Sequence, residues 1–305
     1  MNKEFLDLAE QLKSSVSCTV RLNELMSGHT SFKIGGPADI LVLPESIEQL
    51  REVLKVVKET VVPLTLLGNG SNVLVRDKGI RGIVIKLGNM LRHFYEAEDL
   101  LVFGSGYSLA LASYKAMECG KTGMEFAVGI PGSIGGAVYM NAGAYDGEMQ
   151  NIVNCVKVMD LQGNERVLTA EELNFGYRKT SLQNSGLIVT EVTLKMPSCN
   201  KDEIKSKMDD FSHRRISKQP LEMPSAGSMF KRPPGYFAGT LIDQAGLKGY
   251  TVGGAQISTK HAGFVVNVGG ATAADVLQLI KDVQTKIKAG VGVELQPEVL
   301  VIGEE

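Results

Sequence analysis

The chain has 305 residues, enough for two or three domains that together bury about three quarters of the unfolded surface. Its composition, 44% hydrophobic and 22% charged, is typical of a soluble globular protein, and the net charge of −2 indicates neither a nucleic-acid groove nor an anionic membrane surface as partner. Four widely spaced cysteines without a CxxC pair indicate reduced thiols rather than a disulfide framework or a zinc site.

The first part of the chain predicts an α+β arrangement that ends near residue 88. Residues 1–15 are amphipathic and charged, which indicates a helix and not a signal peptide. A Ser-x-x-Gln capping box and an apolar stripe predict a second helix over residues 46–60. Residues 61–75 contain two apolar runs around a glycine turn, and residues 82–87 have the pattern of a further strand.

The second predicted part runs from residue 89 to about 200. A helix near 108–119 is followed by the uncharged, glycine-rich segment 126–145. Twenty residues without charge resemble a membrane span, but five glycines and one proline make this segment a poor lipid-facing helix. Short alternating runs between residues 151 and 198 predict an antiparallel or mixed sheet.

The third predicted part, residues 201–290, begins with a charged helix over 201–218. The clearest helical pattern covers 271–290, with Thr272 as N-cap and Gly290 as C-cap. After it, residues 291–303 alternate like a strand. The predicted fold class is therefore α+β throughout.

Two glycine loops are candidates for holding a pyrophosphate group. They read GNGSN (68–72) and GIPGSIGG (129–136), and each contains a serine hydroxyl, Ser71 or Ser133. Glycine permits close approach of backbone N–H groups to phosphate oxygens. Neither loop fits the Rossmann fingerprint or the P-loop. Each alone can equally be a tight turn, whereas the two together favour contact with a cofactor.

Seven segments occur in one order that is specific as a combination. They are HTSFKIGGPADILVLP (29–44), GNGSNVLV (68–75), GIPGSIGGAVYMNAGAY (129–145), FGYRKTSL (175–182), PSAGSMFK (224–231), GGAQISTKHAGFVVN (253–267) and PEVLVIG (297–303). Over nearly the whole chain, this set resembles the UDP-N-acetylenolpyruvoylglucosamine reductases, flavoenzymes of bacterial cell-wall precursor synthesis.

The resemblance implies a three-domain fold. Residues 1–88 and 89–200 would form two FAD-binding subdomains of the vanillyl-alcohol-oxidase type, and residues 201–290 a substrate-binding domain, with the C-terminal strand 291–305 returning to the active site. NADPH would reduce FAD, and the reduced flavin would reduce the enolpyruvyl group of UDP-N-acetylglucosamine-enolpyruvate to UDP-N-acetylmuramate. We expect a cytoplasmic monomer that binds neither nucleic acid nor membrane.

Three residues match the family's catalytic positions. The resemblance implies Ser228 as the proton donor, Glu298 as a second acid and Arg178 as the cation near the substrate carboxylate. From the residues alone, Ser228 would be a turn residue, Glu298 an exposed charge at a strand end and Arg178 a surface cation. The match to the family reverses these three interpretations.

The resemblance also implies binding residues. Those predicted to contact the cofactor are Gly68, Asn69, Gly70, Ser71, Asn72, Gly129, Ile130, Pro131, Gly132, Ser133, Gly135, Asn141, Ala142 and Gly143. Those predicted to contact the substrate are Tyr177, Arg214, Lys218, Lys231, Arg232 and Gln256. The cations of 213–218 can alternatively be the solvated end of a helix, where they suit its dipole. The four histidines are scattered and show no metal spacing, so no metal site is predicted.

The chain departs from the family pattern at three places. Residues 177–192 run directly from the arginine motif into a strand, without the loop whose tyrosine covers the substrate in some members. Arg232 replaces a common asparagine, and Leu300 replaces a common cation. Two alternatives stay open: an FAD-dependent oxidase of the same fold, and a non-catalytic nucleotide-binding protein. Neither glycine loop contains a histidine for covalent flavin attachment, which disfavours the oxidase.

Overall fold

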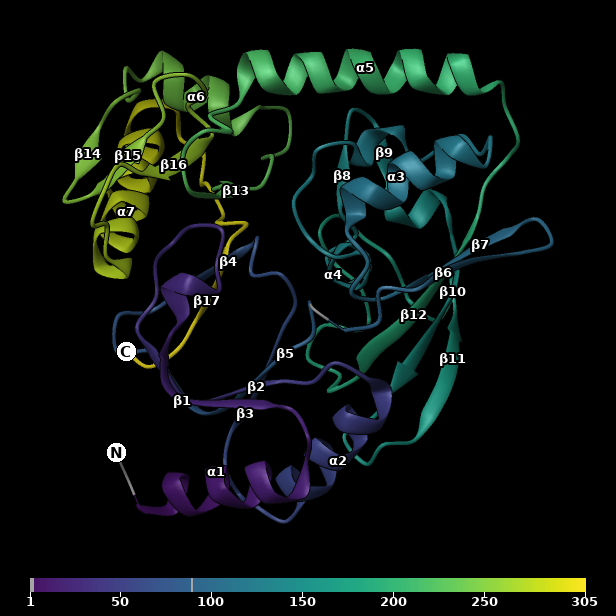
Figure 1. Ribbon diagram of the computed structural model, residues 1–305. Coiled ribbons are helices and arrows are strands. Elements are labelled where there is room, and N and C mark those ends of the chain that lie inside the picture. The colour runs from purple at the N-terminus through teal and green to yellow at the C-terminus, as the bar shows by residue number, and fades with distance from the viewer. Residues whose placement is uncertain (1–2, 89) are drawn as a thin grey trace. The chain divides into compact units, whose positions relative to one another are not determined.

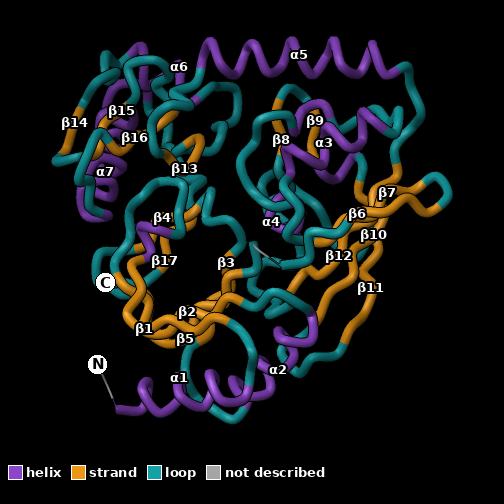
Figure 2. Tube along the Cα trace, in the orientation of Figure 1, coloured by secondary structure: helices purple, strands orange, loops and turns teal. Residues whose placement is uncertain are grey.

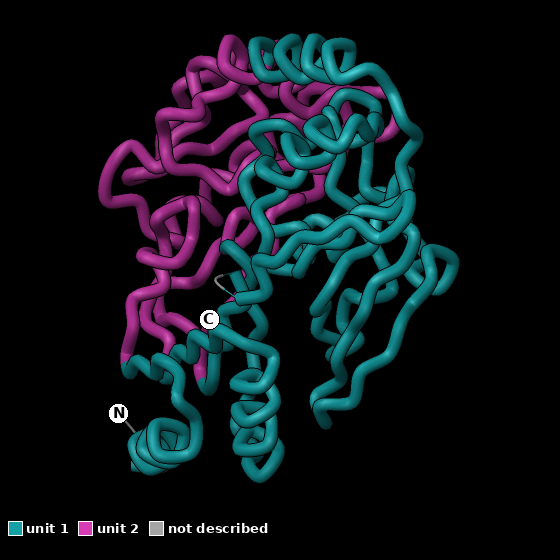
Figure 3. Tube along the Cα trace, turned by 45° about the vertical axis from the view of Figure 1, so that its right-hand side comes forward, with its two compact units in different colours: residues 1–22, 40–69, 82–214 teal, residues 23–39, 70–81, 215–305 magenta. Residues whose placement is uncertain are grey.

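A computed structural model describes residues 3–88 and 90–305 of the chain (Figure 1). The chain forms two compact units (Figure 3). The first unit comprises residues 1–22, 40–69 and 82–214, and the second comprises residues 23–39, 70–81 and 215–305. Residues 1, 2 and 89, where the first predicted helix and the second predicted part begin, lie outside the described residues. The three-part division stays a prediction.

Three helices of the first unit confirm predicted ones: α1 (Lys3–Ser15), α2 (Ile47–Lys58) and α3 (Leu109–Glu118). The short helix α4 (Ile134–Tyr139), inside the glycine-rich segment, was not predicted, and 3-10 turns lie at Glu125–Ala127 and Met149–Asn151. At the start of α2, the Ser46 hydroxyl accepts the Gln49 N–H at 3.2 Å. The Gln49 side chain accepts the N–H of Glu45, at 2.7 Å, so the return bond of the predicted capping box is displaced by one residue.

A four-stranded sheet has the order β1 (Thr19–Leu25), β2 (Pro37–Leu43), β5 (Ile80–Lys86), β3 (Leu64–Leu67) (Figure 2). Strands β3 and β5 are parallel, in register from Leu64 opposite Ile83 to Leu67 opposite Lys86. The apolar stripe of α2 is buried in the same core as residues of α1, β2 and β5. Burial of this stripe explains why the 3.6-residue periodicity of the sequence predicts the helix.

A five-stranded antiparallel sheet forms the second core of the first unit. Its order is β11 (Glu165–Thr169), β10 (Val153–Met159), β12 (Ile188–Lys195), β7 (Leu100–Gly104), β6 (Phe94–Ala97). Alternate residues such as Phe103, Val156 and Val192 are buried with apolar residues of α3 and α4. The period-2 pattern therefore predicts both the strands and their buried face.

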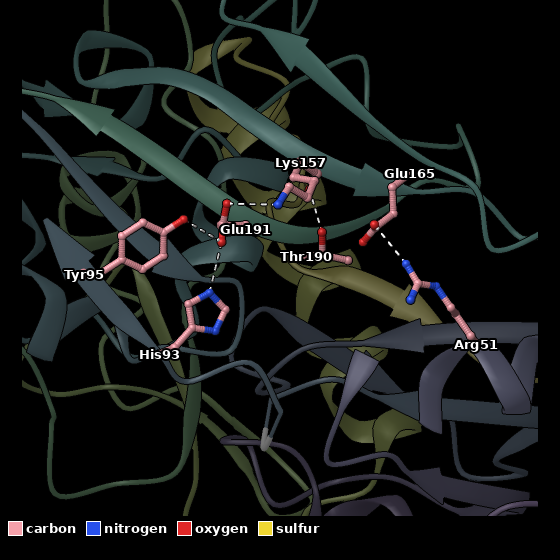
Figure 4. Close-up of polar contacts among 7 residues, drawn as sticks. All are labelled: Arg51, His93, Tyr95, Lys157, Glu165, Thr190 and Glu191. Carbon is pink, nitrogen blue, oxygen red and sulfur yellow. Dashed lines mark hydrogen bonds and ion pairs between the residues drawn. The ribbon is translucent and has the colours of Figure 1, made fainter. Parts of the chain in front are cut away.

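A polar cluster lies on the strands of this sheet (Figure 4). Glu191 accepts the hydroxyl proton of Tyr95 at 3.3 Å, and the same carboxylate oxygen lies 3.1 Å from Nε2 of His93. Its other oxygen is 3.4 Å from Nζ of Lys157 on the neighbouring strand β10. Because three side chains converge on one carboxylate, the cluster is a cross-strand stabilising feature of the sheet.

The second unit contains a four-stranded antiparallel sheet. Its order is β13 (Ser225–Ser228), β16 (Phe264–Asn267), β15 (Ala255–Ile257), β14 (Thr251–Val252), and it is accompanied by α6 (Ala238–Gln244) and α7 (Ala273–Val291). A 3-10 turn at Met26–Gly28 also belongs to this unit. Apolar residues of α6, α7 and the sheet share one buried core. Helix α5 (Lys201–Lys218), predicted from its charged pattern, begins in the first unit and ends in the second.

Helix α7 confirms its predicted start and corrects its predicted end. Thr272 is the N-cap and forms a reciprocal capping box with Asp275. The helix continues through Gly290, and Gly292 is the C-cap with a left-handed φ of +71°. A C-terminal glycine is favoured because it adopts this φ without steric cost, and Gly292 is the residue that needs it.

The strand predicted over residues 291–303 is shorter than the pattern indicates. Strand β17 (Leu300–Ile302) pairs in parallel with β4 (Val73–Val75), and Pro297 forms a single antiparallel bridge with Phe230. Leu295 is buried in the core of the second unit, which explains the apolar alternation that precedes β17. The alternation of apolar residues therefore reports which side chains are buried, and it does not show that all of these residues pair in one sheet.

No helix within residues 3–88 and 90–305 has the length and apolar content to span a bilayer. The uncharged segment 126–145 instead contributes a 3-10 turn, α4 and the two-residue strand β8 (Gly143–Ala144), which pairs with β9 (Gly147–Glu148). Buried residues of this segment belong to the core behind the five-stranded sheet.

Glu125, a buried carboxylate in the first unit, is held by several donors. It accepts the hydroxyl of Thr122 at 2.5 Å and the N–H of Gly123 at 2.7 Å, and Nζ of Lys207 on α5 lies 3.7 Å away. Burial opposes ionisation, but these hydrogen bonds and Lys207 together hold the pKa of Glu125 below its ordinary value of 4.5.

We predict that Glu125 contributes acid-sensitive stability. Because its native pKa lies below the unfolded value, the contribution is complete above about pH 4.5 and is lost as pH falls through the native pKa. Glu125→Gln should therefore lower the free energy of unfolding at pH 7 by about 1–3 kcal/mol, with a smaller difference from wild type at pH 3.5. Urea denaturation followed by circular dichroism measures both values.

Glu118→Gln is the matched control, since Glu118 is an exposed partner of Lys115 and should change stability little. A difference between wild type and Glu125→Gln that stays constant from pH 7 to pH 3.5 would contradict the proposed linkage.

Candidate active site and cofactor loops

The two glycine loops approach each other in the first unit. A Cβ added at Gly68 would lie 3.3 Å from the hydroxyl oxygen of Ser133. Asn69 packs against Gly88, where there is no room for a side chain. Residues 68–69 and the loop before α4 are thus neighbours, although more than 60 positions separate them in the sequence.

The loop before α4 has the features of an anion cradle. Gly129 and Gly132 have positive φ values, +71° and +137°. The N–H groups of Gly129, Gly132 and Ser133 have no acceptor within residues 3–88 and 90–305. The Ser133 hydroxyl caps α4 by accepting the Gly136 N–H at 3.3 Å. Unpaired N–H groups on a glycine-rich turn are suited to phosphate oxygens.

Other glycines of the predicted set are required by the fold. A Cβ at Gly135 would lie 2.8 Å from Cβ of Ser105, and one at Gly70 would lie 2.3 Å from the carbonyl oxygen of His29. Gly143 belongs to the β8–β9 hairpin and has no room for a side chain beside Gly147. Their contact with a cofactor stays a prediction, but close packing already explains why these positions are glycine.

Asn141 is fully buried and organises the turn after α4. Its side-chain amide donates to Glu148 and to the carbonyl of Gly176, each at 3.0 Å. Its side-chain oxygen accepts the Gln150 N–H at 3.0 Å. With φ at +43°, Asn141 adopts a left-handed conformation that asparagine tolerates better than most residues. The side chain therefore ties the segments near 141, 148 and 176 together.

Arg178 lies against this turn. Its guanidinium donates to the carbonyl oxygen of Gly143 at 3.0 Å and to that of Asn141 at 3.4 Å. The guanidinium carbon is 5.1 Å from the ring centre of Tyr177, whose side chain is exposed. The fold therefore brings the predicted catalytic arginine and a predicted substrate residue to predicted cofactor residues. Arg178 is not a freely solvated cation.

In the second unit, a backbone ladder holds Ser228 and Glu298. Ser228 ends the edge strand β13, opposite Phe264 of β16. The next residue, Met229, donates its N–H to Gly263 at 2.8 Å and accepts the N–H of Glu298 at 2.9 Å. Three segments far apart in the sequence are thus joined at consecutive backbone bonds. The Ser228 hydroxyl is partly buried and donates to the carbonyl of Phe230 at 3.2 Å.

Asn72 of the first glycine loop belongs to the same arrangement. Its side-chain amide donates to the carbonyl of Glu298 at 3.3 Å, and its carbonyl accepts the Leu300 N–H at 3.0 Å. Glu298 is partly buried, between the exposed Pro297 and the buried Val299. The end of a predicted cofactor loop is thus bonded to the backbone of a predicted catalytic residue.

The predicted substrate cations have different environments. Arg214 forms an ion pair with Asp210 at 2.7 Å on the exposed side of α5, which fits the alternative of a solvated helix end. Lys218 is exposed, and Lys231 is partly buried with its N–H bonded to Gln296 at 2.8 Å. Arg232 is exposed and lies 4.0 Å above the ring of Phe237. Their contacts with substrate stay predictions.

Gln256 lies on β15, where its side-chain amide donates to the hydroxyl of Thr251 at 3.0 Å. No group of three or more metal-ligating side chains is found within residues 3–88 and 90–305. Within the second unit, the backbone bonds of Met229 place Ser228 and Glu298 on neighbouring segments. A hydroxyl and a carboxylate are residue types suited to proton transfer, and their joint action stays a prediction.

Comparison with known proteins gives a consistent assignment along the chain. Residues 38–169 match the family described as FAD binding domain, and residues 219–302 match the family described as UDP-N-acetylenolpyruvoylglucosamine reductase, C-terminal domain. The chain is 50% identical over 302 residues to the UDP-N-acetylenolpyruvoylglucosamine reductase of Clostridium perfringens strain SM101, covering 99% of this chain and 98% of the relative.

Two further relatives agree. Identity to the UDP-N-acetylenolpyruvoylglucosamine reductase of Clostridioides difficile strain 630 is 49% over 286 residues, with 94% of each chain covered. The crystal structure of the UDP-N-acetylenolpyruvylglucosamine reductase of Thermus caldophilus superposes with a TM-score of 0.78 at 38% identity. The match covers 93% of this chain and 98% of that one.

We predict that Asn141→Ala destabilises the first unit, and that the loss of stability exceeds the cost of placing alanine at a positive φ. Loss of the buried side chain leaves Gly176 and Gln150 without their partner, so the unfolding free energy should fall by about 2–4 kcal/mol. Asn184→Ala is the matched control, because Asn184 also has a positive φ, +62°, but is exposed. Equal losses in the two variants, measured by urea denaturation, would contradict this role of the Asn141 side chain.

Proposed function

The chain belongs to the UDP-N-acetylenolpyruvoylglucosamine reductase family, and from that membership we propose that it reduces UDP-N-acetylglucosamine-enolpyruvate to UDP-N-acetylmuramate. The cofactor is FAD, the electron donor is NADPH and the product serves peptidoglycan synthesis. The observation that carries the proposal is the identity of about half the residues over nearly the whole chain. It favours the reductase over the oxidase and the non-catalytic binding protein that the sequence left open.

The loops of the first unit fit a dinucleotide. The N–H groups of Gly129, Gly132 and Ser133 would hold the pyrophosphate, and Gly68 beside Ser133 leaves the backbone accessible to it. When bound, FAD supplies hydride transfer between NADPH and the enolpyruvyl double bond. Hydride addition to the double bond leaves negative charge on the neighbouring carbon and its carboxylate, so the protein must supply a proton and stabilise that charge.

Ser228 is the proposed proton donor to carbon. A positioned acid contributes about 10²–10⁴ in rate, which corresponds to roughly 3–5 kcal/mol of barrier. A serine hydroxyl is a weak acid, so its alkoxide needs nearby cations, for which Lys231 and Arg232 are the proposed candidates. The backbone ladder at Met229 supports this role because it fixes the position of the serine on a rigid strand.

Glu298 and Arg178 have the complementary proposed roles. Glu298 assists protonation as the second acid, and its backbone position is fixed by Met229 and Asn72. Arg178 stabilises the substrate carboxylate, with its guanidinium oriented by the carbonyls of Asn141 and Gly143. A planar guanidinium is suited to a carboxylate because it offers several N–H donors in one plane.

We also propose that the enzyme acts as a cytoplasmic monomer. The four cysteines are free thiols, which fits a reducing compartment. The modest net charge of −2 supports neither nucleic acid nor membrane as a partner.

We expect the purified protein to be yellow, with a flavin absorption spectrum. NADPH oxidation should depend on added UDP-N-acetylglucosamine-enolpyruvate, and oxygen should not replace it as acceptor. A colourless protein that takes up no FAD would defeat the proposed function, and rapid NADPH oxidation in air without the UDP-sugar would favour the oxidase.

We expect Ser228→Ala to separate the two half-reactions. NADPH should still bleach the flavin at close to the wild-type rate, while reoxidation by the enolpyruvyl substrate should slow by about 10²–10⁴ because the proton donor is lost. Stopped-flow absorbance measures both steps. Ser225→Ala, in the same strand β13, is the control and should leave both rates nearly unchanged. Normal reoxidation in Ser228→Ala would remove Ser228 as the acid.

A further inference from the structure

Arg178, the residue proposed to stabilise the substrate carboxylate, has an unusual backbone conformation. Its φ is +57°, in the left-handed region, whereas the φ of Tyr177 before it is not positive. The N–H of Lys179 donates to the carbonyl of Gly176 at 3.1 Å, and the reverse bond measures 2.9 Å, so these two residues close a tight turn. A positive φ at the third position of such a turn is typical of type II, which favours glycine or asparagine there. A residue with a Cβ is disfavoured at this φ, so the surrounding structure must hold Arg178 in place.

Gln183 holds the carbonyl of Arg178. The side-chain amide nitrogen of this glutamine donates to the carbonyl oxygen of Arg178 at 3.1 Å and to that of Tyr139 at 3.2 Å. Because both partners are acceptors, the NH₂ end of the amide, with its two hydrogens, is the end that faces them. The backbone N–H of Gln183 donates to the carbonyl of Thr180 at 3.3 Å. One partly buried side chain thus joins two main-chain segments.

The second carbonyl, that of Tyr139, belongs to the last residue of α4. It also accepts the hydroxyl of the buried Thr180 at 2.9 Å. The last carbonyls of a helix have no partner within the helix, so Thr180 and Gln183 supply donors that α4 needs. Helix α4 begins directly after Ser133, the end of the loop suited to phosphate, and its 6 residues span about 9 Å. It is therefore a short, rigid connection from this loop to the turn of Arg178.

The opposite side of the turn is held by Asn141. Its amide donates to the carbonyl of Gly176 at 3.0 Å. The guanidinium of Arg178 in turn donates to the carbonyls of Asn141 and Gly143, which follow α4. Asn141 therefore holds the first carbonyl of the turn and Gln183 the third. A residue in an unfavourable conformation persists only where its surroundings fix it, and here two amides do so.

We propose that Gln183 is a positioning residue for the reaction. Its amide fixes the backbone of Arg178, and thereby the guanidinium, relative to α4 and the loop before that helix. This proposal rests on the proposed function, since it concerns the residue that stabilises the substrate carboxylate. A displacement of about 1 Å can slow a reaction by about 100-fold. The sequence gives no signal for this role, because the groups that Gln183 binds are main-chain carbonyls, which every residue has.

Three variants separate the donor from the shape of the side chain. Gln183→Glu keeps the shape but offers no hydrogen at pH 7, Gln183→Leu offers none either, and Gln183→Lys supplies N–H donors again. We expect the first two to slow flavin reoxidation by the enolpyruvyl substrate by about 10- to 100-fold. Flavin reduction by NADPH should stay within about twofold of wild type, because it does not use the substrate carboxylate. Gln183→Lys should restore reoxidation to within about threefold of wild type.

Gln162→Glu is the matched control for the added charge, since Gln162 is exposed in the same unit and should leave both rates nearly unchanged. Stopped-flow absorbance measures the two half-reactions separately. Equal slowing of both half-reactions in Gln183→Glu would indicate a merely structural role and overturn the proposal. Failure of Gln183→Lys to restore reoxidation would also overturn it, because the donor would then not be what matters.

A double-mutant cycle tests whether Gln183 acts through Arg178. Arg178→Ala alone should slow reoxidation. Adding Gln183→Glu to it should slow this step by no more than about twofold further, because the guanidinium to be positioned is gone. Losses that multiply in the double variant would show that the two residues act independently, and they would overturn the proposal.

Amide hydrogen exchange separates this proposal from the proposed function. In the FAD-loaded protein, Gln183→Glu should speed exchange of the Gly176 and Lys179 amides by about tenfold or more, and Gln183→Lys should not. If wild type does not turn over the enolpyruvyl substrate, the reductase assignment fails while this comparison still decides whether Gln183 holds the turn. Unchanged exchange in Gln183→Glu would overturn the proposal.

The converse outcome is equally distinct. If wild type turns over the substrate and every Gln183 variant matches its reoxidation rate, the reductase assignment stands and the proposal for Gln183 is overturned. Circular dichroism verifies that each variant is folded. If the glutamate variant is not, the comparison of the leucine and lysine variants decides.

Discussion

The backbone ladder at Met229 is the constraint on which the proposed chemistry depends. This residue joins Gly263 on one side and Glu298 on the other through bonds of 2.8 and 2.9 Å. Its neighbour Ser228 is thereby fixed on a strand edge, and the backbone of Glu298, 70 positions away in the sequence, is joined to the same segment. Main-chain hydrogen bonds do not depend on side-chain rotamers, so they fix the backbone position of Ser228, the proposed acid, whichever rotamer its hydroxyl adopts.

In the first unit, side-chain hydrogen bonds hold the loops in place. Within the described residues, the N–H groups of Gly129, Gly132 and Ser133 in the loop before α4 have no acceptor, so they are available for a phosphate group. At the other end of α4, the buried amide of Asn141 ties the following turn to two neighbouring segments. Arg178 then uses the carbonyls of the same turn for its orientation. Buried polar groups destabilise a fold when they lack hydrogen bonds. These groups are hydrogen-bonded, and their bonds hold a loop in place.

Local sequence patterns predict most of the helices and strands. They fail where the pairing of a strand depends on a segment that is distant in the sequence. Helix α7 begins at its predicted cap, because a threonine three residues before an aspartate satisfies the first N–H groups locally. Its end was wrong by two residues, since the sequence holds two candidate glycines and only the backbone φ distinguishes them. The strand predicted after it is not continuous: residues 296–298 bond to the segment around Phe230, and β17 pairs with β4. Apolar alternation reports burial and does not report which segment lies alongside.

The sequence by itself determined the α+β class, the glycine loops, the family and the identity of Ser228, Glu298 and Arg178 as candidates. The class and the glycine loops depend on residue types at short spacing, whereas the family and the three candidates depend on the resemblance of seven segments to known enzymes. Only the tertiary structure decided which glycines are needed for packing and that Asn141 anchors the turn against which Arg178 lies. Each of these depends on an atom supplied by another segment, and the fold alone determines which segments meet.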